Sequence, residues 1–97
     1  MKFKLNYSGE NIVNLIRKIG YYYQGKKGEE YSLVRRPKGY PRFHLYVIEN
    51  PDNQELFFNL HLDQKRPVYK YAPVHAGEYE GKIVEEEAER IKQAIQK

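Results

Sequence analysis

Two of the three histidines in this 97-residue chain lie in short segments where polar and apolar residues alternate. His44 lies in R-F-H-L-Y, and His61 lies in L-H-L-D, where Asp63 follows two residues later. If both segments are strands, alternation places His44, His61 and Asp63 on one face of a sheet, opposite the apolar side chains. The third histidine, His75, lies twelve residues beyond Asp63 and could fold back over this face.

These side chains are compatible with three kinds of chemistry. His44 and His61 could be catalytic, acting as an acid/base pair on a phosphodiester while Arg42 and a lysine hold the phosphate charge. Alternatively His44, His61 and Asp63, together with His75, have the ligand types of a two-histidine, one-carboxylate site for a divalent metal ion. The same side chains could also bind an anionic ligand without any reaction. Because a solvated antiparallel sheet face carries similar residues, the sequence leaves these alternatives open.

Two turn signals indicate which strands position these side chains. R-P-K-G-Y at 36–40 has the pattern of a type I turn with a glycine bulge, which pairs Arg36 with Tyr40 in a hairpin. This hairpin joins strands at Glu30–Arg36 and Pro41–Glu49. N-P-D-N at 50–53 predicts a second hairpin. Three antiparallel strands therefore form a meander.

Counting outward from the turns predicts the strand register. Leu33 lies opposite Phe43 in the first hairpin, and Val47 lies opposite Leu56 in the second, so that apolar residues pair with apolar residues. The meander then has one apolar face that packs against the helices.

The same register predicts the contacts on the polar face. Arg42 lies opposite His61 and His44 opposite Asn59, so the two histidines are diagonal neighbours roughly 7 Å apart at the backbone. This face comprises Ser32, Val34, Arg36, Arg42, His44, Tyr46, Asn59, His61 and Asp63.

The remaining segments complete an α+β fold. Alternation predicts a strand at Lys2–Tyr7, and apolar spacing predicts helices at about 9–19 and 83–96. The glycine- and lysine-containing segment 21–30 reads as a mobile loop, and 64–81 as an irregular connection with a short strand at 68–71. The predicted order is β-α-β-β-β-α, in which an N-terminal strand joins the three-stranded meander and both helices cover one sheet face.

Composition narrows the class of protein. The length predicts a single domain spanning residues 1–97. The chain has no cysteine, which excludes disulfides, thiolate metal sites and a cysteine nucleophile. No apolar run approaches the roughly 20 residues of a membrane span, and the N-terminus lacks a signal-peptide core, so we expect a cytoplasmic protein that does not enter membranes.

Positive charge is concentrated in the first 44 residues, which hold ten lysines or arginines against three glutamates. Interleaved basic and aromatic residues suit RNA or another polyanion, although a solvated hairpin tip has the same composition. A protein partner that binds the polar face, which the helices leave open, is a further alternative. The candidate nucleic-acid-binding residues are Lys26, Lys27, Arg35, Arg36, Lys38, Tyr40 and Arg42.

The runs S-G-E-N-I-V-N-L-I-R-K-I-G-Y and L-V-R-R-P-K-G-Y-P-R-F-H-L-Y, followed by a C-terminal helix, resemble the small HicA-type RNA-cleaving toxins. The resemblance covers about residues 8–63 and the last helix. It implies a double-stranded-RNA-binding-domain-like fold and ribonuclease activity, with His44 in the place of the catalytic histidine. The segments F-H-L-Y and L-H-L-D-Q-K, before H-x-G-E-Y, also resemble small bacterial proteins with no assigned activity.

Overall fold

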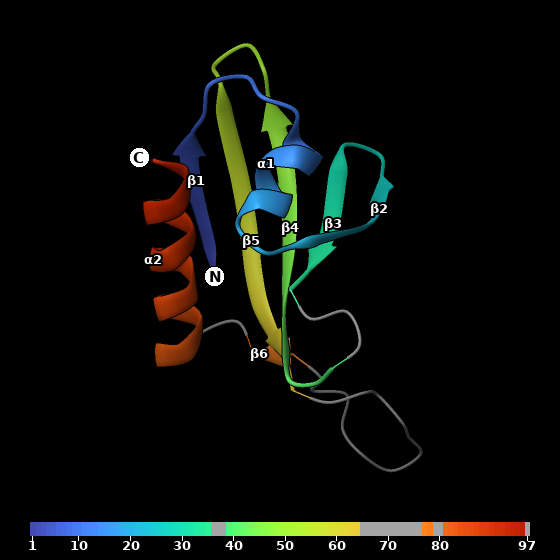
Figure 1. The fold of residues 1–97 in the computed structure, drawn as a ribbon, viewed down its shortest axis with the longest axis vertical. Helices are drawn as coiled ribbons and strands as arrows, with labels where there is room; N and C mark the ends of the chain where they lie inside the picture. Colours follow the sequence, from blue (N-terminus) through green and yellow to red (C-terminus); the bar gives the residue numbers. More distant parts are fainter. Residues whose placement is uncertain (36–38, 65–76, 79–80, 97) are drawn as a thin grey trace.

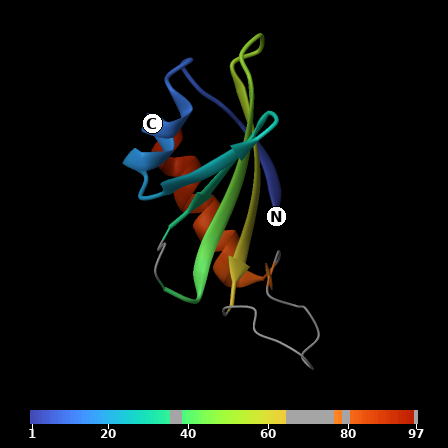
Figure 2. The same ribbon diagram turned by 90° about the vertical axis from the view of Figure 1, so that its right-hand side faces the viewer.

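An antiparallel sheet with both helices on one of its faces makes up the fold (Figures 1 and 2). The computed structural model describes residues 1–35, 39–64, 77–78 and 81–96. The α+β class predicted from the sequence is confirmed. In chain order the elements are β1 (Lys2–Asn6), α1 (Ile12–Lys18), β2 (Tyr22–Lys27), β3 (Glu30–Val34), β4 (Arg42–Asn50), β5 (Glu55–Asp63), β6 (Gly77–Glu78) and α2 (Lys82–Ile95).

The strands follow the order β1-β5-β4-β3-β2 across the sheet, and the short β6 also pairs with β5. The predicted N-terminal strand is confirmed: β1 lies antiparallel to β5, with Phe3 opposite Phe58 and Leu5 opposite Leu56. Figure 1 shows β1 and β2 at opposite edges of the sheet. The central strands β4 and β5, which carry the two histidines, are therefore supported on both sides.

The segment predicted as a mobile loop at 21–30 instead contains β2, so the meander has four strands rather than three. β2 is an edge strand whose residues are mostly exposed on both faces, which is why it lacks the alternation of a half-buried strand. A register shift between Tyr23 and Gly25 interrupts its pairing with β3. The turn to β3 uses Gly28 at φ +61°, a left-handed conformation that glycine adopts without strain.

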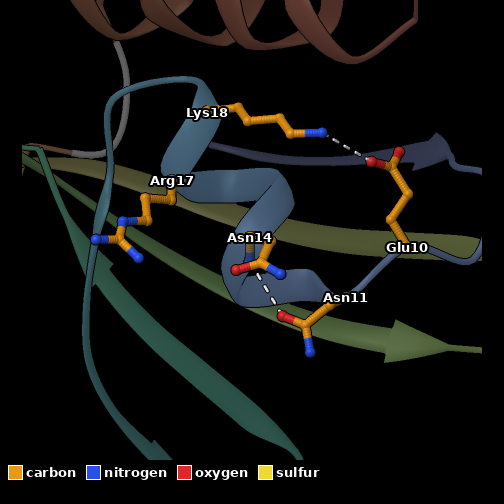
Figure 3. Close-up of a pocket in the computed structure, with 5 residues that line it drawn as sticks. All are labelled: Glu10, Asn11, Asn14, Arg17 and Lys18. Atoms are coloured by element: carbon orange, nitrogen blue, oxygen red, sulfur yellow. Dashed lines mark hydrogen bonds and ion pairs between the residues drawn. The ribbon is translucent and has the colours of Figure 1, made fainter.

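Helix α1 is shorter than predicted and begins later. Its N-cap is Asn11, because the Asn11 Oδ1 atom accepts a hydrogen bond from the backbone N–H of Asn14 at 3.1 Å (Figure 3). The helix ends before Gly20, whose φ of +97° is the left-handed conformation that commonly follows a helix C-terminus.

Helix α2 agrees closely with the predicted C-terminal helix, because its apolar stripe is long and regular. Val84, Ala88 and Ile91 are buried against the sheet. Within the described residues, neither helix combines the length and the apolar character that a membrane span requires. The core joins both helices to the apolar sheet face and includes Leu5, Ile12, Leu15, Ile16, Leu33, Leu45, Val47, Leu56, Phe58, Leu60, Leu62, Val84, Ala88 and Ile91.

The predicted register of the first hairpin is wrong by two residues. Leu33 pairs with Leu45, not Phe43, and the Arg35 N–H donates to the Phe43 carbonyl at 3.0 Å. The connection between β3 and β4 is therefore longer than the turn at 36–40 predicted. The predicted pairing of Arg36 with Tyr40 lies outside the described residues, as does the predicted strand at 68–71.

The second hairpin shows the same error of two residues. Val47 pairs with Phe58, not Leu56, because the four residues of the turn are 51–54 rather than the predicted 50–53, and Gln54 adopts φ +54°. The Gln54 N–H donates to the Pro51 carbonyl at 3.3 Å within this turn. Since side chains alternate with a period of two, an even shift leaves every side chain on its predicted face and changes only its cross-strand partner.

A buried carboxylate ties α2 to the rest of the fold. The side chain of Glu87 accepts hydrogen bonds from the Tyr21 hydroxyl at 2.7 Å, from Arg35 at 2.8 Å and from Arg90 at 2.9 Å. Arg90 also donates to the Ile19 carbonyl at the end of α1 at 2.8 Å. Burial, reinforced by the adjacent Glu87 charge, raises the pKa of Tyr21, so the phenol stays a hydrogen-bond donor.

Candidate metal centre

His44 on β4 and His61 on β5 lie directly opposite each other on the sheet face that faces away from the helices. Their ring centroids are 4.8 Å apart. The predicted diagonal arrangement is wrong because of the register error, since Asn59 pairs with Tyr46 and not with His44. The correction brings the two imidazoles closer than the sequence indicated.

Asp63 contacts both imidazoles. Its Oδ1 is 2.9 Å from Nε2 of His61, and its Oδ2 is 3.5 Å from Nδ1 of His44. Arg42, which pairs with Asp63 across the strands, has its Nε 3.5 Å from the same Oδ2. His44, His61 and Asp63 each offer a ligand atom, and these atoms all lie within 4.8 Å of one another.

The other ring nitrogen of His44, Nε2, contacts Ser32 instead of Asp63. Nε2 of His44 lies 2.7 Å from the hydroxyl of Ser32, and that hydroxyl donates to Oε1 of Gln24 at 3.3 Å. A hydroxyl that donates to Gln24 must accept from His44, which places the imidazole proton on Nε2 and the lone pair on Nδ1. Nδ1 of His44 and Oδ2 of Asp63 are then two acceptors that face each other, an arrangement that a cation between them would stabilise.

Both imidazoles are largely removed from water. His61 is 5% exposed, and the side chains of His44 and Asp63 are 12% and 16% exposed. Burial, followed by repulsion from His61, lowers the pKa of His44 to about 4 despite the nearby Asp63. Burial also lowers the pKa of His61. Both rings are neutral at pH 7, which is the state that binds a metal ion.

The predicted nucleic-acid-binding residues are spread over the molecule. Arg42 lies at the histidine cluster, with its guanidinium 4.6 Å from the centre of the Tyr40 ring. Arg35 reaches the helix side instead and binds Glu87. Lys26 and Lys27 lie at the far end of β2, next to the turn into β3. Arg36, Lys38 and His75 lie outside the described residues, so the structure does not place the fourth predicted metal ligand.

Ser32 and Gln24 are the residues that sequence reasoning missed at this site. The sequence predicts the correct face for Ser32 but no role, and it predicts a loop at Gln24. Gln24 could be placed next to Ser32 only if β2 were predicted as a strand. The exposed sequence of β2 lacks the alternation of polar and apolar residues that would indicate one.

A hollow beside α1 is a different kind of surface. It is lined by polar residues of the short helix and the chain before it, among them Glu10, Arg17 and Lys18 (Figure 3). Lys18 pairs with Glu10 at 3.6 Å. Neither a histidine nor a buried carboxylate lies among the lining residues, so this hollow offers no comparable chemistry.

Comparison of the chain with protein-family models, with curated proteins and with solved structures finds no match. The open sheet face, which lies opposite the helices, carries the geometry from which a function can be inferred. The cluster of His44, His61 and Asp63 is where that geometry is most specific.

Proposed function

We propose that this protein binds a divalent transition-metal ion of the zinc class through His44, His61 and Asp63. The observation that carries this proposal is the pair of facing acceptors, Nδ1 of His44 and Oδ2 of Asp63, 3.5 Å apart. Imidazole nitrogens and carboxylate oxygens are the ligands that zinc takes in proteins without cysteine. With three protein ligands, a bound ion keeps an open position at which it can act as a Lewis acid.

The spacing of the donor atoms supports the proposal. Zinc bonds of roughly 2.0–2.1 Å in a tetrahedral site put neighbouring ligand atoms roughly 3.3 Å apart. The distances from Asp63 oxygens to His61 Nε2 and His44 Nδ1 are 2.9 and 3.5 Å. Ser32 supplies the outer hydrogen bond that orients a metal-bound imidazole.

The direct test is a zinc titration of the protein followed by calorimetry and by NMR of the histidine rings. We expect one ion per chain, with the His44 and His61 signals moving together. Asp63→Asn should weaken binding by at least about 100-fold, because it removes a charged ligand. Glu55→Gln is the matched control, since it changes a carboxylate on the same strand and face that pairs with Lys4 instead. Independent behaviour of the two rings, or equal effects of the two substitutions, would refute the metal centre.

The second candidate is a nucleic-acid or phosphate-ligand binding module of HicA or dsRBD type with ribonuclease activity at His44 and His61. Strand β2 supports nucleic-acid binding, because it carries two exposed aromatic rings and two exposed lysines. Tyr22 and Tyr23 are 54% and 50% exposed, and Lys26 and Lys27 follow on the same strand. Metal-independent cleavage needs one protonated imidazole near neutral pH, whereas burial lowers the pKa of both rings. We therefore rank this candidate second.

Titration with structured RNA tests the second candidate. Binding through β2 should weaken steeply as salt rises and should fall further in the double variant Lys26→Gln, Lys27→Gln. Affinity that is absent, or unaffected by both salt and these substitutions, would exclude binding at β2. Cleavage that survives chelation of metal ions but disappears in His44→Ala would favour the ribonuclease over the metal centre.

A further inference from the structure

The open sheet face continues from the histidine cluster into an apolar groove at the other end of β4 and β5. Ile48 and Phe57 pair across these strands and are 39% and 41% exposed, although both are large apolar residues. The groove has a volume of about 500 Å³, within the range typical of small-molecule sites. Both helices lie on the opposite face (Figure 2).

The groove and the histidine cluster are joined by one cross-strand pair. Tyr46 and Asn59 line the groove and are opposite each other. The Tyr46 ring also lies 4.4 Å from the ring of His44, centre to centre. From His44 to Ile48 the strand advances four residues, or about 13 Å at 3.3 Å per residue. A ligand of that length would reach from the metal centre to the apolar end.

The polar groups along this path indicate the chemistry of the ligand. Oδ1 of Asn59 is buried and has no hydrogen-bond partner among the described residues, so a ligand N–H at this point would satisfy it. Arg42 and a bound metal ion lie at one end and favour an anionic head. Ile48 and Phe57 at the other end favour an apolar tail.

The charges beside the groove disfavour a polyanion. Lys4 is paired with Glu55 at 3.4 Å, and Glu30 lines the same groove as Lys2. Two lysines are thus offset by two glutamates, and the described residues of this face do not form the row of cations that a nucleic-acid backbone needs. The small volume also suits a short organic molecule better than a protein surface.

We propose that the metal-loaded protein binds an N-acyl amino acid or a closely similar carboxylate along this face. The carboxylate contacts the metal ion and Arg42, the amide N–H donates to Asn59, and the acyl or aryl body covers Ile48 and Phe57. This inference rests on the proposed metal centre, which supplies the binding site for the head group.

The test uses N-phenylacetyl-β-alanine as the probe, titrated into the zinc-loaded protein by calorimetry and NMR. Its carboxylate, amide and phenyl ring match the three parts of the path. N-acetyl-β-alanine lacks the apolar body, and N-propylphenylacetamide lacks the carboxylate. We expect the full probe to bind at least about 10-fold more tightly than either fragment, because each end contributes binding free energy.

Ile48→Thr and Phe57→Thr should each weaken probe binding by about 5- to 10-fold, since they shorten the apolar wall while retaining good strand propensity. Ile83→Thr is the control, because Ile83 is a 58% exposed apolar residue on α2. Zinc affinity should be unchanged in all three variants, which also verifies that they fold.

The outcomes separate this inference from the proposed metal centre. If zinc does not bind, the metal centre fails. If zinc binds but the full probe binds no better than its fragments, or Ile48→Thr and Phe57→Thr bind it as well as Ile83→Thr, this inference is overturned and the metal centre stands. Displacement of the probe by single-stranded RNA, with shifts at Ile48 and Phe57, would also overturn it in favour of a nucleic-acid surface.

Discussion

At the scale of single residues, the proton on His44 decides which chemistry the open face can perform. With the proton on Nε2, the lone pair on Nδ1 faces Asp63 and suits a metal ion. With the proton on Nδ1, His44 would accept a hydrogen bond from the Ser32 hydroxyl and donate one to Asp63. This is the hydrogen-bond pattern of the Ser-His-Asp triad of serine hydrolases. The hydrogen bond from Ser32 to Gln24 favours the first arrangement.

Nitrogen chemical shifts of the metal-free protein test this assignment. We expect His44 to be neutral at pH 7 with its proton on Nε2, and Gln24→Ala to raise the fraction with the proton on Nδ1, because Ser32 would be free to donate. A predominant Nδ1–H form in the unmodified protein would contradict the metal centre as drawn.

Protonation of the same ring should lower stability in acid. The pKa of His44 in the folded protein is about 4, below the usual histidine value of 6.5, so between these values the unfolded chain binds more protons than the folded one. The free energy of unfolding should therefore fall as the pH drops from about 6.5 towards 4. In thermal unfolding of the metal-free protein, His44→Gln should show a weaker dependence on pH in this window. An unchanged pH dependence would mean that His44 does not carry this effect.

Arg42 should oppose metal binding, because its guanidinium lies near the same Asp63 oxygen. Arg42→Gln is expected to raise zinc affinity about 5- to 10-fold while weakening binding of the carboxylate probe. Arg17→Gln, which removes an equal charge from exposed α1, is the control for net charge. Calorimetry of the three proteins measures both effects, and a loss of zinc affinity in Arg42→Gln would show that Arg42 organises the site instead.

At the scale of elements, the helices and strands with one buried face are the ones that the sequence predicts. Strands β3, β4 and β5 and helix α2 have an apolar face, and this periodicity is visible in the sequence. Strand β2 is exposed on both faces, so its sequence does not alternate and predicts a loop instead. Register was less predictable, because the first connection is longer than its turn motif indicates and the second turn is displaced by one residue. An error of two residues leaves each side chain on its predicted face. The face of His44 and His61 could therefore be predicted, but their direct pairing across the strands could not.

The attachment of α2 depends on a polar feature that periodicity does not show. Glu87 is buried and holds Tyr21, Arg35 and Arg90 together. Glu87→Gln should lower the free energy of unfolding by about 1–3 kcal/mol, because it removes charge-assisted hydrogen bonds while both arginines still reach water. Denaturant unfolding measures this loss. Glu86→Gln, an exposed neighbour on the same helix, should change stability by less than about 0.5 kcal/mol. Equal effects would show that the buried network contributes nothing.

At the scale of the whole molecule, the two helices cover one sheet face and leave the chemistry on the other (Figure 2). The core that holds β4 and β5 in register is continuous with both helices, so the positions of the imidazoles and Asp63 depend on the fold as a unit. Among the described residues, the positive charge of the first 44 positions is not gathered on one surface, because Arg35 and Arg42 turn to opposite faces and bind carboxylates there.

This coupling between site and fold predicts that a metal ion stabilises the entire protein. Zinc at about 100 times its dissociation constant should add about 2.7 kcal/mol to the free energy of unfolding if it binds only the folded state. For a domain of this size, that gain raises the Tm by roughly 10–20 °C. Asp63→Asn should abolish the rise and Glu55→Gln should retain it. His75→Ala would reduce the rise only if His75 completes the ligand set, as the sequence predicted. An unchanged Tm at saturating zinc would mean that the facing acceptors on β4 and β5 do not bind the ion.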